Sequence, residues 1–220
     1  MLAALSQGSA ARRVRPAASL VLPGAAGAYA STPDSAGVTV TGDIDVRADV
    51  VVSASGLQAI AGQWGGGGAQ AWLLYYIGSS GILHLVISDR QDAAATASVA
   101  LSSRLQVRAV WVSATGVTTF YTRAAGGAAL SVNDGWAQLG SAVAGVAGAI
   151  LNVSVSLAVG CSSDGGNPST GRTREVVLMS GVAGTVRASP DFAAQAAGAT
   201  SFSDAQGNVW TVNGTASIGV

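Results

Sequence analysis

The stretch ASLVLPGAAGAYASTPDSAGVTVTGDIDVRADVVV, residues 18–52, decides the expected fold. From residue 43 onward, the even positions from Ile44 to Val52 are apolar and the odd positions from Asp43 to Asp49 are charged. Successive side chains of a strand point to opposite faces, so this alternation predicts a half-buried antiparallel strand with one apolar and one solvated face. Two shorter extended pieces, 20–22 and 29–33, precede it and end in turn-forming residues.

Alternation with a period of two recurs along most of the chain. It predicts further strands at 56–64, 70–77, 82–88, 104–112, 116–122, 151–159 and 173–180, and a weaker one at 93–101. The four glycines at 65–68 indicate a hairpin tip rather than a phosphate loop, because no Lys-Ser/Thr pair follows them. The sequence therefore predicts an all-β sandwich of two packed antiparallel sheets with under about a tenth helix.

The two ends of the chain carry a family resemblance. A Tyr29-x-x-x-Pro33 segment precedes the long strand, and the chain closes with PDF (190–192), GATSFSD (198–204) and GNVWTVNG (207–214). This order resembles laminin G-like and pentraxin-like domains, the concanavalin A-like jelly rolls. It is most similar to modules of this kind in virion structural proteins of phages that infect high-GC bacteria. The resemblance covers about residues 18 to 218 and implies a jelly roll whose last strand lies near its first.

Residues 17–220 are expected to form the jelly-roll domain, and residues 1–16 an extended N-terminal arm. The arm contains Arg12, Arg13 and Arg15 and no acidic residue, whereas residues 34–220 contain eight arginines and eleven acids. A basic arm on a chain that is neutral as a whole favours an acidic protein partner over nucleic acid. The arm and the apolar run after it imitate a signal peptide, but Pro23-Gly24 interrupts that run. No run reaches the ~18 apolar residues of a membrane helix.

Large aromatic side chains stand out in a chain dominated by small residues. Six of them are expected to be structural anchors: Tyr29, Trp111, Trp136, Phe192, Phe202 and Trp210. Trp136 follows an Asn-Asp-Gly turn at 133–135, and it is expected to pack into the edge of the core. Four other aromatics are expected to be exposed and are the candidates for stacking on sugar rings: Trp64, Trp72, Tyr75 and Tyr76. The single cysteine, Cys161, excludes an internal disulfide and is expected to be a buried thiol.

Residues suited to catalysis are scarce. The chain has one histidine, His84, and one glutamate, Glu175. A glycosidase of concanavalin-like fold would need two carboxylates close together. Asp43 and Asp45 have a suitable spacing, but they belong to the face that is expected to be solvated. The sequence therefore predicts that the protein is not an enzyme.

No cofactor is expected. The resemblance makes a calcium ion possible, and its ligands would come from two loop pairs, Asn133 with Asp134 and Asp164 with Asn167. Neither pair forms the dense run of acidic residues typical of calcium loops.

Three functions remain open. The resemblance first implies a non-enzymatic virion structural protein, made in the bacterial host cytoplasm and displayed on the virion surface as a capsid decoration, minor capsid or minor tail protein. The arm arginines would then contact major capsid or tail proteins, and copies would form a homo-oligomer in the assembly. The alternative is a glycan-binding module for host adhesion, and a glycosidase is the least favoured. Nucleic acid and membranes are not expected partners.

Overall fold

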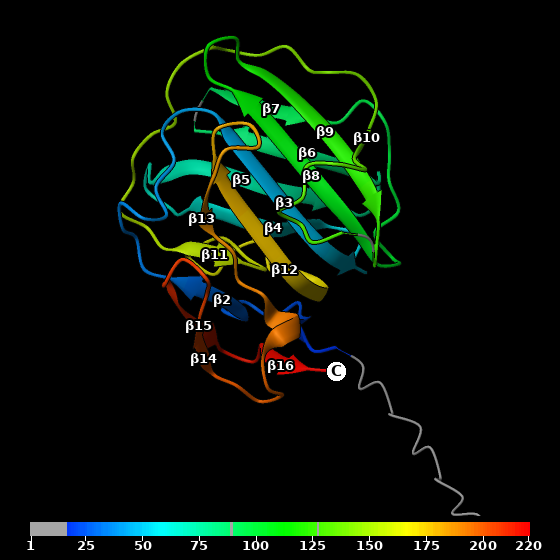
Figure 1. Cartoon of the computed structure of the whole chain (residues 1–220), viewed down its shortest axis with the longest axis vertical. Helices are drawn as coiled ribbons and strands as arrows, with labels where there is room; N and C mark the ends of the chain where they lie inside the picture. The colour runs from blue at the N-terminus through cyan, green and yellow to red at the C-terminus, as the bar shows by residue number, and fades with distance from the viewer. Residues whose placement is uncertain (1–16, 89, 127) are drawn as a thin grey trace, which may run out of the picture.

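The computed structural model describes residues 17–88, 90–126 and 128–220, which form an all-β sandwich (Figure 1). The first sheet has the strand order β10-β9-β8-β3-β12-β1-β16, with β13 also paired to β12; the second has the order β14-β15-β2-β11-β4-β5-β6-β7. Neighbouring strands pair antiparallel in both sheets. The described residues contain a single short helical turn, the 3-10 helix η1 (Phe192–Ala194). The predicted fold class is therefore confirmed.

The strands of the first sheet are β1 (Ser19–Pro23), β3 (Ile44–Val52), β8 (Leu105–Val112), β9 (Val117–Ala124), β10 (Ala137–Gln138), β12 (Thr170–Ser180), β13 (Thr185–Ala188) and β16 (Ser217–Gly219). Those of the second sheet are β2 (Tyr29–Thr32), β4 (Leu57–Trp64), β5 (Gln70–Ile77), β6 (Ile82–Ile87), β7 (Gln91–Ala94), β11 (Leu157–Val159), β14 (Ser201–Ser203) and β15 (Val209–Asn213).

Two predicted strands are wrong in extent. Of the strand expected at 151–159, only β11 forms, because the preceding backbone finds other partners: the Ile150 N–H donates to the Thr41 carbonyl and the Leu151 N–H to Ser88 Oγ. The strand expected at 93–101 ends at Ala94. Beyond it the chain bends, and Thr96 Oγ1 accepts a hydrogen bond from the Ser141 N–H.

The main core lies between the two sheets. In Figure 1, β3, β8, β9 and β12 run diagonally in front of β4, β5 and β6. The apolar face of β3, from Ile44 to Val52, is buried in one cluster with Trp72 of β5 and Trp111 of β8. Alternate side chains of each strand thus point inward, as the period of two predicts. Trp72 and Trp111 are fully buried, so burial of their rings contributes much of the core's apolar area.

The last strands lie beside the first strands of the described residues, as the resemblance implied. β16 pairs with β1, and β15 pairs with β2. Phe192 contacts Phe202 and Trp210 edge-to-face, with ring centroids 5.5 and 6.5 Å apart. Asp204 orders this corner, since its carboxylate accepts hydrogen bonds from Trp210 Nε1 at 3.1 Å and the Ser189 N–H at 3.0 Å. Tyr29, at the start of β2, is half-buried.

The charged face of β3 is buried, and the prediction that it is solvated is wrong. Asp45 and Arg47 have no exposed surface, and Asp49 is only 3% exposed. Residues 128–136, called the covering segment below, lie over this outer face of the first sheet. Arg47 holds the segment by donating to the carbonyl oxygens of Leu130 and Val132, at 2.8 and 3.1 Å. The alternating residues of β3 correctly predicted which side chains share a face. They could not predict that the covering segment lies over the charged face.

Asp45 is the centre of this buried network. Its two carboxylate oxygens each accept a hydrogen bond from Arg47, at 3.0 and 2.8 Å, and from Arg108, at 3.0 and 2.7 Å. The Ala183 N–H donates a further one at 2.9 Å. Burial acts to raise the pKa of Asp45, but the hydrogen bonds and charges of the two arginines outweigh it and lower that pKa. The carboxylate is therefore ionised and fully partnered.

Trp136 closes the network from above rather than entering the sandwich core. It is half-buried, and its ring lies 4.3 Å from Cζ of Arg123, whose guanidinium donates to carbonyl oxygens of the covering segment. The ring also packs against a separate apolar cluster that includes Leu130 and Met179. The expected packing into the core edge is thus replaced by a cation–π contact on the outer face.

Changing Asp45 to Asn should lower the free energy of unfolding by about 3–5 kcal/mol, because two buried guanidinium groups would lose their counter-charge. Since the pKa of Asp45 is lowered in the folded state, the parent protein should also lose this stabilisation as the pH falls below about 4. Urea unfolding followed by tryptophan fluorescence measures both effects. Asp134→Asn is the matched control, because the Asp134 side chain is exposed, and it should change stability by less than about 0.5 kcal/mol. Equal unfolding midpoints for the two variants would contradict the role given to Asp45.

Candidate functional site

A β-bulge in β12 shapes the open part of the first sheet's outer face. Thr173 pairs with Val50 of β3, and the next paired residue is Glu175, opposite Asp49. Arg174 is therefore the extra residue of the bulge. Bulges bend a strand locally and re-aim its side chains. Here the bulge places Glu175 on the outer face of the sheet beside Asp49.

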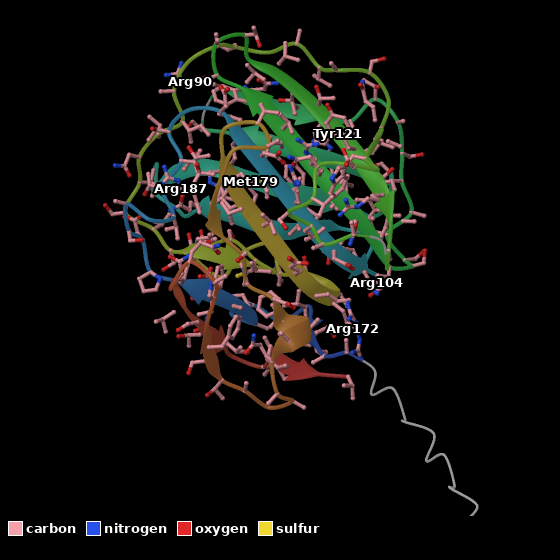
Figure 2. All side chains as sticks on the ribbon, viewed as in Figure 1. Arg90, Arg104, Tyr121, Arg172, Met179 and Arg187 are labelled. Carbon is pink, nitrogen blue, oxygen red and sulfur yellow. The ribbon has the colours of Figure 1, made fainter. Side chains whose placement is uncertain are left out.

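Two adjoining hollows form a groove at this place. The smaller one, of about 170 Å³, lies between the covering segment and η1, and the larger one, of about 210 Å³, lies over the beginning of β1. Arg104 and Arg174 line both hollows, and Figure 2 shows Arg104 and Arg172 near each other at the start of β12. The polar residues of the groove are Ser19, Asp49, Arg104, Gln106, Arg172, Arg174, Glu175 and Asp191. This set of residues is called the groove below.

Two of the three groove carboxylates are held by structural bonds. Asp49 accepts two parallel hydrogen bonds from Arg104, at 2.7 and 2.6 Å, and a weaker one from Gln106 Nε2 at 3.3 Å. Asp191 caps η1, since its Oδ1 accepts from the N–H groups of Ala193 and Ala194 at 2.9 and 3.1 Å. Neither carboxylate is free to change partners without loss of local structure.

Glu175 is the exception. Burial raises its pKa to about 7, and the negative charges of Asp191 and Asp49 act in the same direction. A backbone N–H of Leu130 and the charge of Arg123 oppose the shift without cancelling it. Near neutral pH this side chain therefore exists partly as a neutral carboxylic acid, which can donate a hydrogen bond as well as accept one.

Arg172 and Arg174 carry charges that the described residues do not neutralise. Arg172 donates to Ser19 Oγ and Arg174 to the Ala17 carbonyl oxygen, both at 3.2 Å, and both acceptors are neutral. Among the described residues, the arginine ion pairs within 4 Å join Arg47 and Arg108 to Asp45 and Arg104 to Asp49. The groove therefore has two guanidinium groups with free donors on one rim.

None of the four aromatics proposed to stack on sugars lines the groove. Trp72 and Tyr76 point into the sandwich core, with exposures of 0% and 4%, so the expectation that they are exposed is wrong. Trp64 and Tyr75 belong to a small cluster on the other face of the second sheet. Tyr75 is itself only 5% exposed and is covered by His84, whose ring stacks on it at 4.5 Å.

His84 is half-buried, and its ring is bonded to a hydroxyl group. Its Nδ1 lies 2.9 Å from the Tyr75 hydroxyl and 3.0 Å from an oxygen of Asp92. The Tyr75 hydroxyl donates to the second oxygen of Asp92 at 2.8 Å, and burial, with the bond and charge of Asp92, raises the pKa of Tyr75. The three side chains use their hydrogen-bonding groups on one another. We therefore interpret them as a structural contact that links β5, β6 and β7 at the surface.

Two of the loop side chains considered for calcium, Asn133 and Asp164, already accept hydrogen bonds within the protein. Asn133 Oδ1 accepts a hydrogen bond from Arg47 at 2.7 Å, so a cation there would meet a guanidinium group. Asp164 Oδ1 accepts from Ser162 Oγ and the Gly166 N–H. In the described ranges, no group of three or more His, Cys, Asp and Glu residues is arranged to hold a metal. Cys161 is buried, and burial raises the pKa of its thiol to about 12.

The arm arginines Arg12, Arg13 and Arg15 lie outside the described residues. Over the part that is described, no helix is long and apolar enough to cross a membrane.

The sandwich is similar to solved structures, although no family model and no curated protein matches the sequence. A heptameric SAP-like pentraxin from Limulus polyphemus superposes with a TM-score of 0.55 at 12% identity, over 76% of this chain and 79% of the pentraxin. A Bacteroides ovatus protein, provisionally described as carbohydrate-binding, superposes with a TM-score of 0.59 at 13% identity. That match covers 93% of this chain but only 60% of the Bacteroides protein. At these identities the similarity shows the fold alone, a jelly roll of two antiparallel sheets.

Proposed function

We propose that this chain is a non-catalytic carbohydrate-binding module and that the glycan occupies the groove. The observation that carries the proposal is the groove itself, a hollow on the outer face of one sheet with several charged and amide side chains around it. Ligand sites are typically concave and hold a few convergent polar groups. The description of the Bacteroides ovatus protein as carbohydrate-binding supports the same function.

The groove has the chemistry that hydroxyl groups require. A neutral Glu175 can donate and accept hydrogen bonds, and the arginines donate only. The Gln106 amide is already bonded to Arg123 and Asp49. Val51, on the outer face of β3, adds apolar surface in the larger hollow, against which the C–H face of a sugar ring could pack. Polar rim and apolar floor together suit an amphipathic ring better than a purely ionic ligand.

The same groove is poorly equipped for hydrolysis. A glycosidase uses two carboxyl groups on opposite sides of the scissile bond. Glu175 could serve as the acid, but Asp49 is bound by Arg104 and Asp191 by the N-terminus of η1. No carboxylate of the groove is left as a free nucleophile or base.

The setting that we propose for the module is the surface of a phage virion. Its support is the sequence resemblance of residues 18–218, together with the basic arm. In this setting Arg12, Arg13 and Arg15 would bind acidic surfaces of capsid or tail proteins, and the jelly roll would present the groove to a host glycan.

Filling the smaller hollow should abolish glycan binding without removing a polar group. Ala193 lines this hollow, and its change to Trp would place a large ring there. Ala194→Trp is the matched control, because Ala194 lies on the same turn, is exposed and does not line the groove. On a glycan array the parent and Ala194→Trp should bind the same glycans, and Ala193→Trp should lose at least about tenfold in signal. Equal loss in both variants, or no binding by the parent, would contradict the proposed site.

Any oligosaccharide that binds should remain intact. Prolonged incubation with the parent protein, followed by product analysis by chromatography, is expected to show no cleavage above a protein-free sample. Cleavage that disappears in the Glu175→Gln variant would show that the groove is catalytic and that the protein is an enzyme.

Attachment to a particle is tested separately from glycan binding. Changing Arg12, Arg13 and Arg15 together to Ala should weaken particle attachment in a salt-dependent manner, because charge-assisted bonds would be lost. Glycan binding should not change. Co-sedimentation with virions at two salt concentrations measures the attachment, and full occupancy by the triple variant would exclude the arm as the anchor.

A further inference from the structure

Resting on the proposed function, we propose that the ligand of the groove is an acidic glycan whose carboxylate or sulfate group is bound by the guanidinium groups of Arg172 and Arg174. The inference concerns the class of sugar, which the fold does not indicate. It depends on which charged side chains of the groove are already paired within the protein.

The three groove arginines differ in whether they are paired with a carboxylate. Arg104 is committed to Asp49 through two short parallel hydrogen bonds. Arg172 and Arg174 are bound only to neutral oxygens, each through one Nη1 at 3.2 Å. A guanidinium group has five N–H donors, so several donors remain on each of these two side chains. Residues 1–16 contain no acidic residue, so the arm cannot supply the missing anion.

Arg172 and Arg174 line the same hollow. Arg172 and Arg174 are two residues apart on β12, and both line the larger hollow although Arg174 is the extra residue of the bulge. They therefore converge on one space. The planar fork of arginine matches the two oxygens of a carboxylate or the oxygens of a sulfate. An acidic substituent on the sugar would satisfy donors that a neutral sugar would leave unmatched.

The larger hollow also has an apolar floor. Val51, whose side chain points to the outer face, lines the same hollow as the two arginines. A free inorganic anion would gain nothing from it, whereas a sugar acid presents a C–H face next to its charged group. Nucleic acid is less suitable, because its binding requires an extended basic surface and the chain as a whole has no net charge.

The charge of the groove should also depend on pH. Glu175 is ionised above its pKa of about 7 and would then repel an anion; below that pH it is neutral. The other charged groups around it are Asp49 of β3, Asp191 beside η1, Arg104, Arg123 of β9 and Arg174. The arginines remain charged at all of these pH values, and the chain's only histidine, His84, lies in the second sheet. Glu175 therefore controls the change in charge between about pH 6 and 8.

Calorimetric titration of the full chain with a matched set of probes tests the inference. The probes are a galactose oligosaccharide, its galacturonic acid counterpart, a sulfated galactose oligosaccharide of the same length, and inorganic sulfate. The two acidic oligosaccharides should bind at least about tenfold more tightly than the neutral one and than inorganic sulfate. Arg172→Gln and Arg174→Gln should each lose about tenfold in affinity for them.

Arg90→Gln is the matched control, because Arg90 is exposed and lies far from Arg104 and Arg172 in Figure 2. It removes the same charge from the protein and should leave affinity unchanged. Between pH 8 and 5.5, binding of the sulfated probe should tighten about threefold in the parent and remain constant in Glu175→Gln. The sulfated probe is used because its own charge does not change over this range.

The outcomes separate the failure of the acidic-glycan inference from the failure of the proposed glycan-binding function. Binding of the neutral probe as tightly as the acidic ones overturns the inference but leaves the proposed function intact. Equal losses in Arg90→Gln and Arg172→Gln also overturn it, since the effect would then follow overall charge. Binding of inorganic sulfate as tightly as the acidic oligosaccharides would show anion binding without sugar recognition. If no oligosaccharide binds, both the inference and the proposed function fail.

Discussion

The rest of the first sheet's outer face depends on the pairing of one buried aspartate with two arginines. Asp45 forms ion pairs with Arg47 and Arg108, and Arg47 in turn binds the backbone of the covering segment. Removing one partner of such a group leaves an uncompensated buried charge, so the network is stable only when complete. The covering segment therefore closes the outer face over Arg47, and the end of β3 near Asp49 remains open as the groove.

The architecture could be predicted because its main determinant is local. Inward-facing residues of β3, β5 and β8 recur at every second position. This apolar pattern is the same whether water or another segment covers the outer face. The charged row of Asp45, Arg47 and Asp49 has the same period whether water or another segment lies above it. Two of the bonds between the covering segment and Arg47 use backbone carbonyls, which carry no side-chain signal, and a third uses the Asn133 side chain. The solvated face was therefore a reasonable prediction, and it was wrong.

The candidate site was less accessible from the sequence for two reasons. A bulge shifts side chains by one residue, and nothing in the alternating TREVVLMS segment marks Arg174 as the extra residue. The pairing of Glu175 with Asp49 joins residues more than a hundred positions apart, and only the sheet order brings them together. One error was avoidable, since adjacent residues of a strand face opposite sides. Tyr75 and Tyr76 could not both have contacted the same sugar.

The interactions that order the groove also limit its chemistry. Arg104 fixes Asp49, and the first turn of η1 fixes Asp191, so these carboxylates stabilise the rim and lose the freedom that a nucleophile or base needs. Glu175 remains as a neutral or singly charged group among them, and Arg172 and Arg174 retain unused donors. A rigid rim with free donors lowers the entropic cost of binding, because its side chains are already ordered. The balance of fixed acids and free arginines therefore favours recognition of a ligand over its conversion.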